Sequence, residues 1–188
     1  DTSEAAAATT SAAAFVPNAW LRIEPNGSLV FVLDRAEMGQ GVHTSLPTIL
    51  AEELGIDPSK LQIENALYGP SYGNPLLVGL QITGGSTSIP AAFGPLRRAG
   101  ATARAMLVTA AAREWKVPIE ECKTPGDGTV QHLASKRQKS YSELARSAAD
   151  LPVPEIAPLK ESSEFIYIGK SRPRLDGTAK VTGTAEFG

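Results

Sequence analysis

The sequence has very few of the residues that build disulfides and metal clusters. Cys122 is its one cysteine, and His43 and His132 are its two histidines. A single cysteine excludes an internal disulfide and any cysteine-ligated zinc or iron–sulfur site. Two histidines without a surrounding group of carboxylates do not suggest a metal site, so the default for each is a satisfied structural histidine. We expect Cys122 to be a small buried residue rather than a nucleophile.

Long hydrophobic runs and an excess of one charge are also missing. No apolar run approaches the roughly 18 residues that span a bilayer. The formal net charge is −2 and the lysines and arginines are scattered, which excludes a basic footprint for nucleic acid. The 188 residues are 42% hydrophobic and 20% charged, and this composition is sufficient for one compact core.

The first seventeen residues have the composition of a processed N-terminus. They begin at Asp1 and consist largely of Ala, Thr and Ser, without a basic region or an intact apolar stretch. Such a remnant often follows a removed export signal, so the expectation is a periplasmic protein in which residues 1–17 are disordered. An arbitrary starting point of the sequence explains the composition equally well.

The following residues alternate between strand and helix patterns. Two runs, 19–24 and 28–34, flank Pro25-Asn26-Gly27 and predict a hairpin at the edge of a sheet. Residues 45–54 have helical spacing and stop before Gly55, which suits a helix C-cap. A short strand is expected over 61–66, followed by a long irregular loop over 68–85, and loops of that length are usually functional or disordered.

The second half predicts a long helix, a hairpin, a short helix and a linker. The helix runs from about Ser88 to Trp115, with Pro95 either kinking it or marking its regular start. A hairpin turns at residues 126–128, and a short helix is capped by Ser140 or Ser142. The predicted fold is α+β: a mixed sheet of short strands and hairpins packed with one long and two shorter helices. The compact domain spans 18–150, with a proline-rich linker over 151–164.

Two predicted helix starts have the same construction. Each is entered through glycines, continues through hydroxyl residues and has proline in its first turn. The residues are Gly39, Gly41, Thr44, Ser45 and Pro47 in the first, and Gly84, Gly85, Ser86, Thr87, Ser88 and Pro90 in the second. Glycine lets the backbone approach a ligand, and the free first-turn N–H groups attract anions. Two such starts could converge on one anionic group.

The alternative is that both segments are ordinary turns and caps. Gln40 favours binding at the first, because a glutamine between two glycines has no evident local partner for its amide. Asp34 and Glu37 flank this loop and suit acid–base chemistry, yet a solvated turn explains them as well. Three arginines of the long helix could meet a phosphate or form a solvated face: Arg97, Arg98 and Arg104.

At "EMGQGVHT" the sequence resembles the molybdenum hydroxylases, the large molybdopterin-binding subunits of the xanthine dehydrogenase and aldehyde oxidase family. The segments "YGNPLLVGLQITGGSTS" and "IGKSRPRLDGTAKVTGTAEFG" are similar to the branch of isoquinoline 1-oxidoreductase beta subunits. The resemblance implies that the sequence is part of a larger molybdopterin-binding domain. It also implies that residues 165–188 form the first strand of a hammerhead-like domain.

The resemblance assigns the family's pterin-contacting positions to the two helix starts. Its Gly-Gln-Gly motif falls on Gly39, Gln40 and Gly41, and His43 and Thr44 complete the string. The second pterin-binding loop falls on Gly84, Gly85, Ser86, Thr87 and Ser88. The implied cofactor is molybdopterin carrying molybdenum, in a cytosine dinucleotide form, with no metal ligand from the chain itself.

The resemblance also implies that other parts of the enzyme supply the catalytic base and the electron-transfer groups. The family's glycine-rich pterin loop and its glutamate base have no counterpart here, so no catalytic residue is assigned. Expected partners are the remainder of the large subunit, a separate subunit with 2Fe–2S clusters, a cytochrome c subunit, and an aldehyde or N-heteroaromatic substrate hydroxylated with water. The alternative is a cofactor-free binding or assembly module that keeps the fold without the chemistry.

Overall fold

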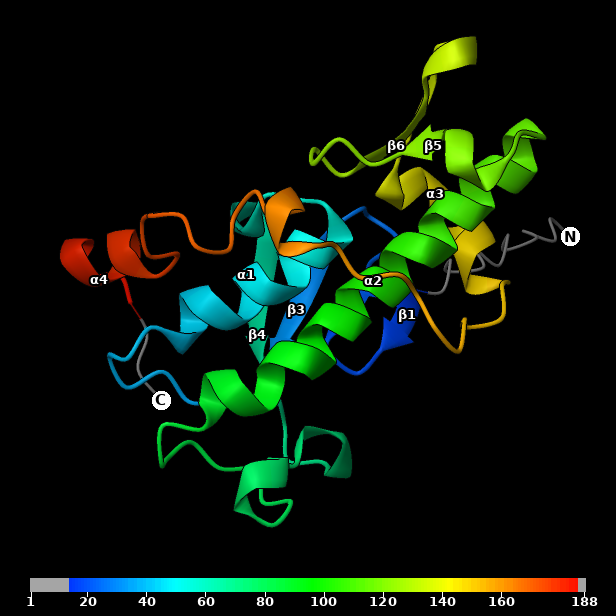
Figure 1. Ribbon diagram of the computed structural model, residues 1–188. Helices are drawn as coiled ribbons and strands as arrows, with labels where there is room; N and C mark the ends of the chain where they lie inside the picture. Colours follow the sequence, from blue (N-terminus) through cyan, green and yellow to red (C-terminus); the bar gives the residue numbers. More distant parts are fainter. Residues whose placement is uncertain (1–13, 186–188) are drawn as a thin grey trace, which may run out of the picture.

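The computed structural model describes residues 14–185, and its main sheet is small and mixed (Figure 1). The strand order is β1-β2-β3-β4. The strands are β1 (Phe15–Asn18), β2 (Leu21–Ile23), β3 (Leu29–Leu33) and β4 (Leu61–Asn65). β1, β2 and β3 pair antiparallel, whereas β3 and β4 pair parallel. The mixed α+β class predicted from the sequence is confirmed.

The predicted hairpin is present as β2 and β3, but its predicted position at a sheet edge is wrong. β1 pairs with β2 on one side and β4 pairs with β3 on the other. β1 also corrects the first boundary, because Phe15 is 2% exposed and part of the core. Ordered chain therefore begins before residue 18, while residues 1–13 of the expected disordered segment lie outside the described residues.

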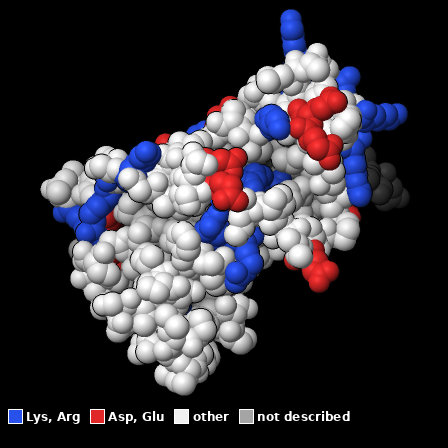
Figure 2. Space-filling model, in the orientation of Figure 1, with Lys and Arg blue, Asp and Glu red and all other residues white. Residues whose placement is uncertain are grey.

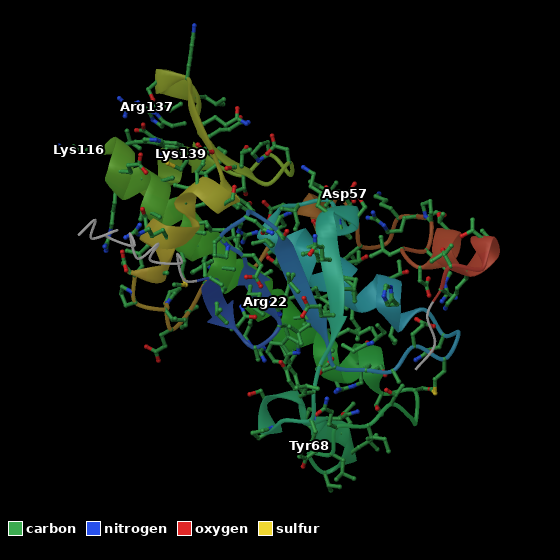
Figure 3. All side chains as sticks on the ribbon, turned by 180° about the vertical axis from the view of Figure 1, so that it is seen from behind. Arg22, Asp57, Tyr68, Lys116, Arg137 and Lys139 are labelled. Carbon is green, nitrogen blue, oxygen red and sulfur yellow. The ribbon has the colours of Figure 1, made fainter. Side chains whose placement is uncertain are left out.

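The described residues form four α-helices beside the sheet: α1 (Val42–Leu54), α2 (Ser88–Trp115), α3 (Tyr141–Ala149) and α4 (Gly177–Thr182). The views from the two sides show that α1 and α2 cover one face of the main sheet (Figures 1 and 3). The three predicted helices are confirmed. α2 is continuous through Pro95, so a helix start at that proline is wrong; Gly94 has no Cβ to clash with the proline ring.

A second sheet of three short strands lies at the far end of α2. The strands are β5 (Cys122–Lys123), β6 (Thr129–His132) and β7 (Arg137–Ser140), all antiparallel. Cys122 is buried as predicted, and Ser140 caps α3 by accepting the N–H of Glu143. His132 is a satisfied structural histidine, because its ring contacts Glu121 and Ser135 at 2.7 and 2.6 Å.

The strand expected over 165–188 is wrong in its described part, where residues 177–182 form α4. The family resemblance implied a strand there, but a strand needs a partner for its backbone groups, and none of the described strands pairs with this segment. Lys180 instead lies 2.5 Å from Asp176, one helical turn away, and this pair favours helix. Short 3-10 helices also occur at Pro58–Lys60, Pro70–Tyr72, Pro75–Leu77, Ile119–Glu121, Leu133–Ser135 and Ser162–Glu164.

Residues 151–176 run over α2 and α1 and are bound there by two buried glutamates. The side chains of Glu52 and Glu53 are both 0% exposed. Glu52 accepts the backbone N–H groups of residues 166, 167 and 168 at 2.6 to 3.0 Å. Its other oxygen accepts the Lys160 ammonium at 3.0 Å. The sequence predicted a linker, and the segment is irregular but anchored.

Glu53 makes the matching contacts to α2. Arg97 donates to its carboxylate at 2.7 Å, and the Lys160 backbone N–H donates at 3.0 Å. Arg104 donates to the Glu53 carbonyl oxygen at 2.6 Å. Neither sequence interpretation of Arg97 and Arg104 holds, since they form no free phosphate site and no solvated face. Arg98 is exposed, as a solvated helix face requires.

The two helices approach closely at Gly100. A Cβ at this position would lie 2.4 Å from the Leu50 carbonyl oxygen and 2.9 Å from the Glu53 Cβ. Both neighbours are fixed by helix α1, so neither can move away cheaply. The crossing of α1 and α2 therefore requires glycine here.

Gly100→Ala is expected to destabilise the chain by about 2 kcal/mol, because overpacking outweighs alanine's better helix propensity. The measurement is the free energy of unfolding in urea. Gly177→Ala is the control, since its Cβ would make an ordinary 3.6 Å contact with the Arg174 side chain. Equal stability of the two variants would contradict the close crossing.

The Glu52 contacts predict a pH dependence. Burial acts to raise the pKa of Glu52, but the backbone N–H donors and Lys160 outweigh it and hold the pKa below its ordinary value of 4.5. The contribution of Glu52 to stability is therefore complete above about pH 4.5 and is lost as pH falls through the lower folded-state pKa. Glu52→Gln should cost about 3 kcal/mol at pH 7 and flatten the loss of stability below pH 4.5.

The control for this variant is Glu155→Gln, which removes an exposed carboxylate. Urea unfolding of the three proteins between pH 3 and 7 gives the comparison. If Glu52→Gln keeps the pH slope of the unchanged chain, Glu52 does not carry the expected contribution.

Candidate functional site

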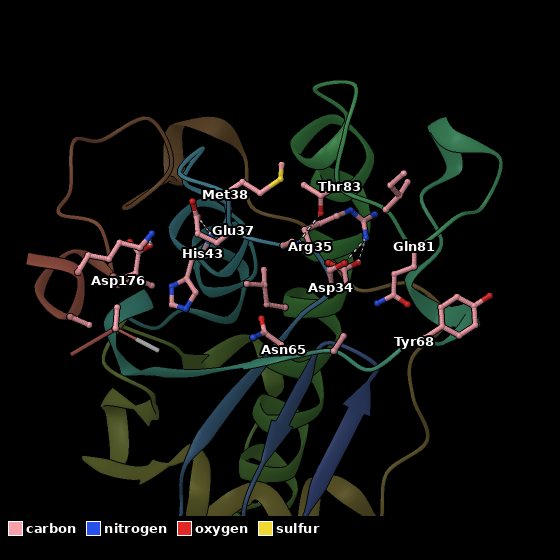
Figure 4. Close-up of a pocket in the computed structure, with 18 residues that line it drawn as sticks. Asp34, Arg35, Glu37, Met38, His43, Asn65, Tyr68, Gln81, Thr83 and Asp176 are labelled. Carbon is pink, nitrogen blue, oxygen red and sulfur yellow. Dashed lines mark hydrogen bonds and ion pairs between the residues drawn. The ribbon is translucent and has the colours of Figure 1, made fainter. Parts of the chain in front are cut away.

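A cavity of about 1050 Å³ opens at the carboxyl ends of the parallel strands β3 and β4 (Figure 4). Leu33 and Asp34 line it where β3 ends, and Asn65 and Ala66 line it where β4 ends. In open sheets with parallel strands, ligands bind beyond the carboxyl ends. The other walls come from residues 35–38 with His43, from Tyr68 and residues 81–83, and from Leu175, Asp176, Ala179, Lys180 and Ala185.

The loop that precedes α1 is organised around the Glu37 carboxylate. Gly39 and Gly41 have φ values of 103° and 93°, a region that favours glycine. The Glu37 carboxylate accepts the N–H groups of Gly39, Gly41 and His43 at 2.7, 3.1 and 2.9 Å. The N-terminus of α1 attracts an anion as predicted, but the anion is a side chain of the protein itself.

The pKa of Glu37 follows from these contacts. Partial burial acts to raise the pKa, while the three backbone donors and the nearby Arg174 guanidinium lower it more. The net shift is downward, so Glu37 is ionised at neutral pH. The sequence interpretation of Glu37 as a solvated turn residue is wrong.

Gln40 is also engaged within the loop. Its amide nitrogen donates to the Ala36 carbonyl oxygen at 2.8 Å, and its amide oxygen accepts the Met38 N–H at 2.5 Å. The premise that nothing local contacts this amide is therefore wrong. Gln40 holds residues 36–40 in one conformation, and that conformation positions the cavity wall.

The segment after residue 170 braces the same loop from outside. Arg174 donates to the Gly39 carbonyl oxygen at 3.0 Å and to the Glu37 carboxylate at 3.1 Å. The Leu175 N–H donates to the Thr44 hydroxyl at 3.0 Å. Thr44 thus faces the 175 segment and not the cavity. No sequence pattern pointed to Arg174, which lies far from Gly39 along the chain.

The second glycine segment lies beside the first without joining it in the cavity. Thr83 accepts the Ala36 N–H at 2.8 Å and so connects the two loops. First-turn residues of both helices also share a small groove, with Thr44 and Ser45 from α1 and Ile89 from α2. The predicted residues that do not line the large cavity are Gly39, Gln40, Gly41, Thr44, Gly84, Gly85, Ser86, Thr87 and Ser88. His43 lines it.

Residues 84–88 have an internal structural role. Gly85 and Ser86 have φ values of 60° and 55°. The Thr87 hydroxyl donates to the Gly84 carbonyl oxygen at 2.8 Å and accepts the Asn74 amide at 2.7 Å. Ser88 is 9% exposed and begins α2. The convergence of both helix starts on one anion is not seen in this arrangement.

Three buried polar atoms at the cavity have no hydrogen-bond partner within residues 14–185: Asp34 Oδ1, Arg35 Nε and His43 Nδ1. Arg35 Nη1 contacts Asp34 Oδ2 at 2.9 Å, and both side chains are almost fully buried. Burial raises the pKa of Asp34 despite the Arg35 charge. Unpaired buried polar atoms are costly, so these atoms point to a polar ligand. Because these residues lie directly after β3 and at the start of α1, their positions in the sequence could have indicated that they belong to the site.

The described residues do not support a metal site formed by the protein, a membrane-spanning helix or a reactive cysteine. Residues 14–185 contain no group of three His, Cys, Asp or Glu side chains suited to hold a metal. None of their helices combines the length and apolar character needed to cross a bilayer. Burial raises the pKa of the Cys122 thiol, as expected for an inert buried cysteine.

Known proteins resemble this chain over most of its length. The molybdopterin cofactor-binding domain, as a family, matches residues 3–184. The isoquinoline 1-oxidoreductase subunit beta of Brevundimonas diminuta is 37% identical over 98% of this chain and 28% of its own. A membrane-bound aldehyde dehydrogenase (pyrroloquinoline-quinone) of Gluconacetobacter polyoxogenes is 35% identical over 93% of this chain and 22% of its own.

A solved structure shows the same fold. Reconstituted CO dehydrogenase from Oligotropha carboxidovorans superposes with a TM-score of 0.51 and 26% identity, over 74% of this chain and 16% of that one. The chain therefore spans about a quarter of the length of the curated relatives it matches.

Proposed function

Because this chain belongs to the molybdopterin cofactor-binding domain family, we propose that it supplies one wall of the cofactor site in a molybdenum-dependent oxidoreductase. The large cavity with its unpartnered polar atoms is the observation that carries this proposal. The remainder of a larger catalytic subunit supplies the opposite wall. The proposed substrate is an aldehyde or an N-heteroaromatic compound, by analogy with the names of the relatives. Hydroxylation with water is proposed from the resemblance of the sequence motifs alone.

The residues present fit a polar, anionic cofactor better than a bare metal ion. Among residues 14–185, Arg35 Nε and His43 Nδ1 have no hydrogen-bond partner, and both side chains line the cavity. The chain offers no metal-ligand cluster between residues 14 and 185, so a metal would be held by the cofactor's own atoms. When bound, the molybdenum cofactor supplies the oxidation–reduction chemistry.

The contribution of this chain is binding and orientation. The loop of residues 36–41 presents a fixed backbone, which Gln40 and Glu37 hold in place. Asp34 Oδ2 accepts from Arg35, while Oδ1 has no hydrogen-bond partner within residues 14–185, and burial raises the pKa of this carboxyl above its ordinary value. Leu175, Asp176, Ala179, Lys180 and Ala185 line one side of the cavity.

Finer points of the proposal concern the assembly. We take the cofactor as the cytosine dinucleotide form, and electrons as leaving through a separate subunit with 2Fe–2S clusters, with a cytochrome c subunit as a further partner. A periplasmic location is part of the same proposal. The support for these points is the resemblance of the sequence motifs to the family.

A second candidate, a cofactor-free assembly module, is favoured by one observation. The Glu37 carboxylate occupies the N–H groups of Gly39, Gly41 and His43. A ligand phosphate at this helix start has to displace Glu37 and break its contact with Arg174. A module that has lost cofactor binding needs no such displacement.

Analysis of the protein purified from its native host separates the two candidates. The expected result is molybdenum and releasable pterin, together with a polypeptide larger than the 19.7 kDa of this chain. The measurements are elemental analysis, pterin release and intact mass. A single 19.7 kDa species with neither molybdenum nor pterin would contradict the catalytic proposal.

Gln40→Ala in the complete enzyme is expected to lower pterin content and turnover together by about tenfold. It removes two hydrogen bonds that fix the loop, each worth about 0.5–1.5 kcal/mol, and about 1.4 kcal/mol corresponds to tenfold. Gln62→Ala is the matched control, because Gln62 is exposed on β4. Unchanged pterin content and turnover in Gln40→Ala would remove Gln40 from the site.

A further inference from the structure

One face of the molecule is free of charge and rich in exposed apolar side chains. Between Glu64 and Arg97 no residue is charged. The space-filling view shows this region as an unbroken white surface below the charged part of the molecule (Figure 2). Its large apolar side chains and their exposed fractions are Leu67 87%, Tyr68 90%, Leu76 56%, Val78 92%, Leu80 57% and Ile82 45%. We call these six residues the apolar loop face.

The apolar loop face is held rigidly from within. Asn74 is 0% exposed, and its backbone exchanges hydrogen bonds with Leu80 and Gly79 at 2.9 Å. The Asn74 amide donates to Thr87 at 2.7 Å, and its side-chain oxygen accepts the Leu76 N–H at 3.0 Å. The loop therefore presents its apolar side chains in a fixed arrangement, and binding would cost little ordering entropy.

The backbone conformation of Val78 also indicates that the apolar loop face is a binding surface. Its φ is 47°, and a β-branched residue in the left-handed region is strained by about 1–3 kcal/mol. Glycine would relieve that strain, yet the chain keeps a valine whose side chain is 92% exposed. An exposed, strained valine gains nothing within this chain, whereas it can gain free energy by burial against a partner.

We propose that the apolar loop face docks against an uncharged, apolar surface of the remainder of the same catalytic subunit. This inference rests on the proposed function, because it takes the chain as part of a longer polypeptide. The matched relatives are several times longer than this chain, which covers 28% and 22% of them. The additional chain in such a subunit provides a partner that is always present.

The position of the face favours this partner. Tyr68 and Ile82 line the large cavity as well as the face, and Figure 4 shows Tyr68 at the rim of the cavity. A polypeptide seated on the face therefore also closes the cavity on that side. The absence of Lys and Arg from the face argues against an anionic membrane surface, which attracts basic side chains.

The test combines footprinting and crosslinking of the protein as purified from its native host. Hydroxyl-radical labelling of Tyr68 and Val78 is normalised to labelling of the unfolded protein. It is compared with labelling of Leu133, which is 71% exposed in the short 3-10 helix that follows β6. The expected result is a several-fold loss of labelling at Tyr68 and Val78 with Leu133 fully labelled. A photocrosslinker at position 78 should give peptides from the same subunit outside these 188 residues.

Three variants control for misfolding. Val78→Lys should restore labelling of Tyr68, whereas Leu133→Lys should leave Tyr68 protected. Val78→Gly suits the left-handed backbone and should fold, with weaker protection of Tyr68 than in the unchanged protein. Full protection of Tyr68 in Val78→Lys would overturn the proposal.

The other outcomes also decide the question. Labelling of Tyr68 as complete as that of Leu133 would overturn the docking, and so would crosslinks to a second copy of these 188 residues or to lipid. Molybdenum and pterin are measured on the same preparation. If Tyr68 is protected from labelling but the preparation contains no molybdenum, only the proposed function is contradicted. If molybdenum is present but Tyr68 is fully labelled, only the docking is contradicted.

Discussion

The cavity side of this protein depends on the buried carboxylate of Glu52. A carboxylate removed from water is costly unless donors replace its solvation. Here the donors are the successive backbone N–H groups of residues 166–168 and the ammonium of Lys160. The carboxylate can stay buried only while the 151–168 segment remains on α1. Helix and segment are therefore stabilised together, without any regular secondary structure in the segment.

The consequences of this anchor extend to the glycine loop. With residues 166–168 fixed, the chain continues to Arg174, which contacts Glu37 and the carbonyl of Gly39. Glu37 in turn fills the N-terminus of α1. Gly100 contributes from the other side, because its missing Cβ lets α2 approach close enough for Arg97 and Arg104 to reach Glu53. Two groups of charged contacts, one at the helix crossing and one at the cavity wall, are thus joined by the backbone of residues 168–174.

Local patterns predicted the parts of the fold that local physics controls. The hairpin around Gly27, the bounds of α2, the end of α1 at Gly55 and the cap at Ser140 all follow from turn, cap and periodicity signals. β1 was missed because it lies next to an alanine-rich stretch that gives no strand pattern. α4 replaced a predicted strand, because Asp176 and Lys180 stabilise a helix where none of the strands described between residues 14 and 185 pairs with the segment.

The site was predictable in its region and not in its contacts. Residues 36–38, directly before the Gly-Gln-Gly motif, line a polar cavity, whereas the motif itself does not. Spacing alone could not show that Gln40 and Glu37 contact the loop itself. Glu52 and Glu53 read as ordinary helix residues, since the backbone donors at residues 160 and 166 lie more than a hundred positions later and Arg97 lies 44 positions later. Sequence reasoning could have identified Asp34, Arg35 and Asn65 as cavity residues, because they lie at the carboxyl ends of two strands that pair in parallel.

Hydrogen exchange of the backbone amides tests the central claim most directly. The account places the 166–168 segment and the 37–43 loop in one connected arrangement, with Glu52 as its anchor. In Glu52→Gln, exchange should accelerate both in peptides covering 166–168 and in peptides covering 37–43, while the β5–β6 hairpin stays as protected as before. Faster exchange at 166–168 alone, with the 37–43 loop unchanged, would contradict the account.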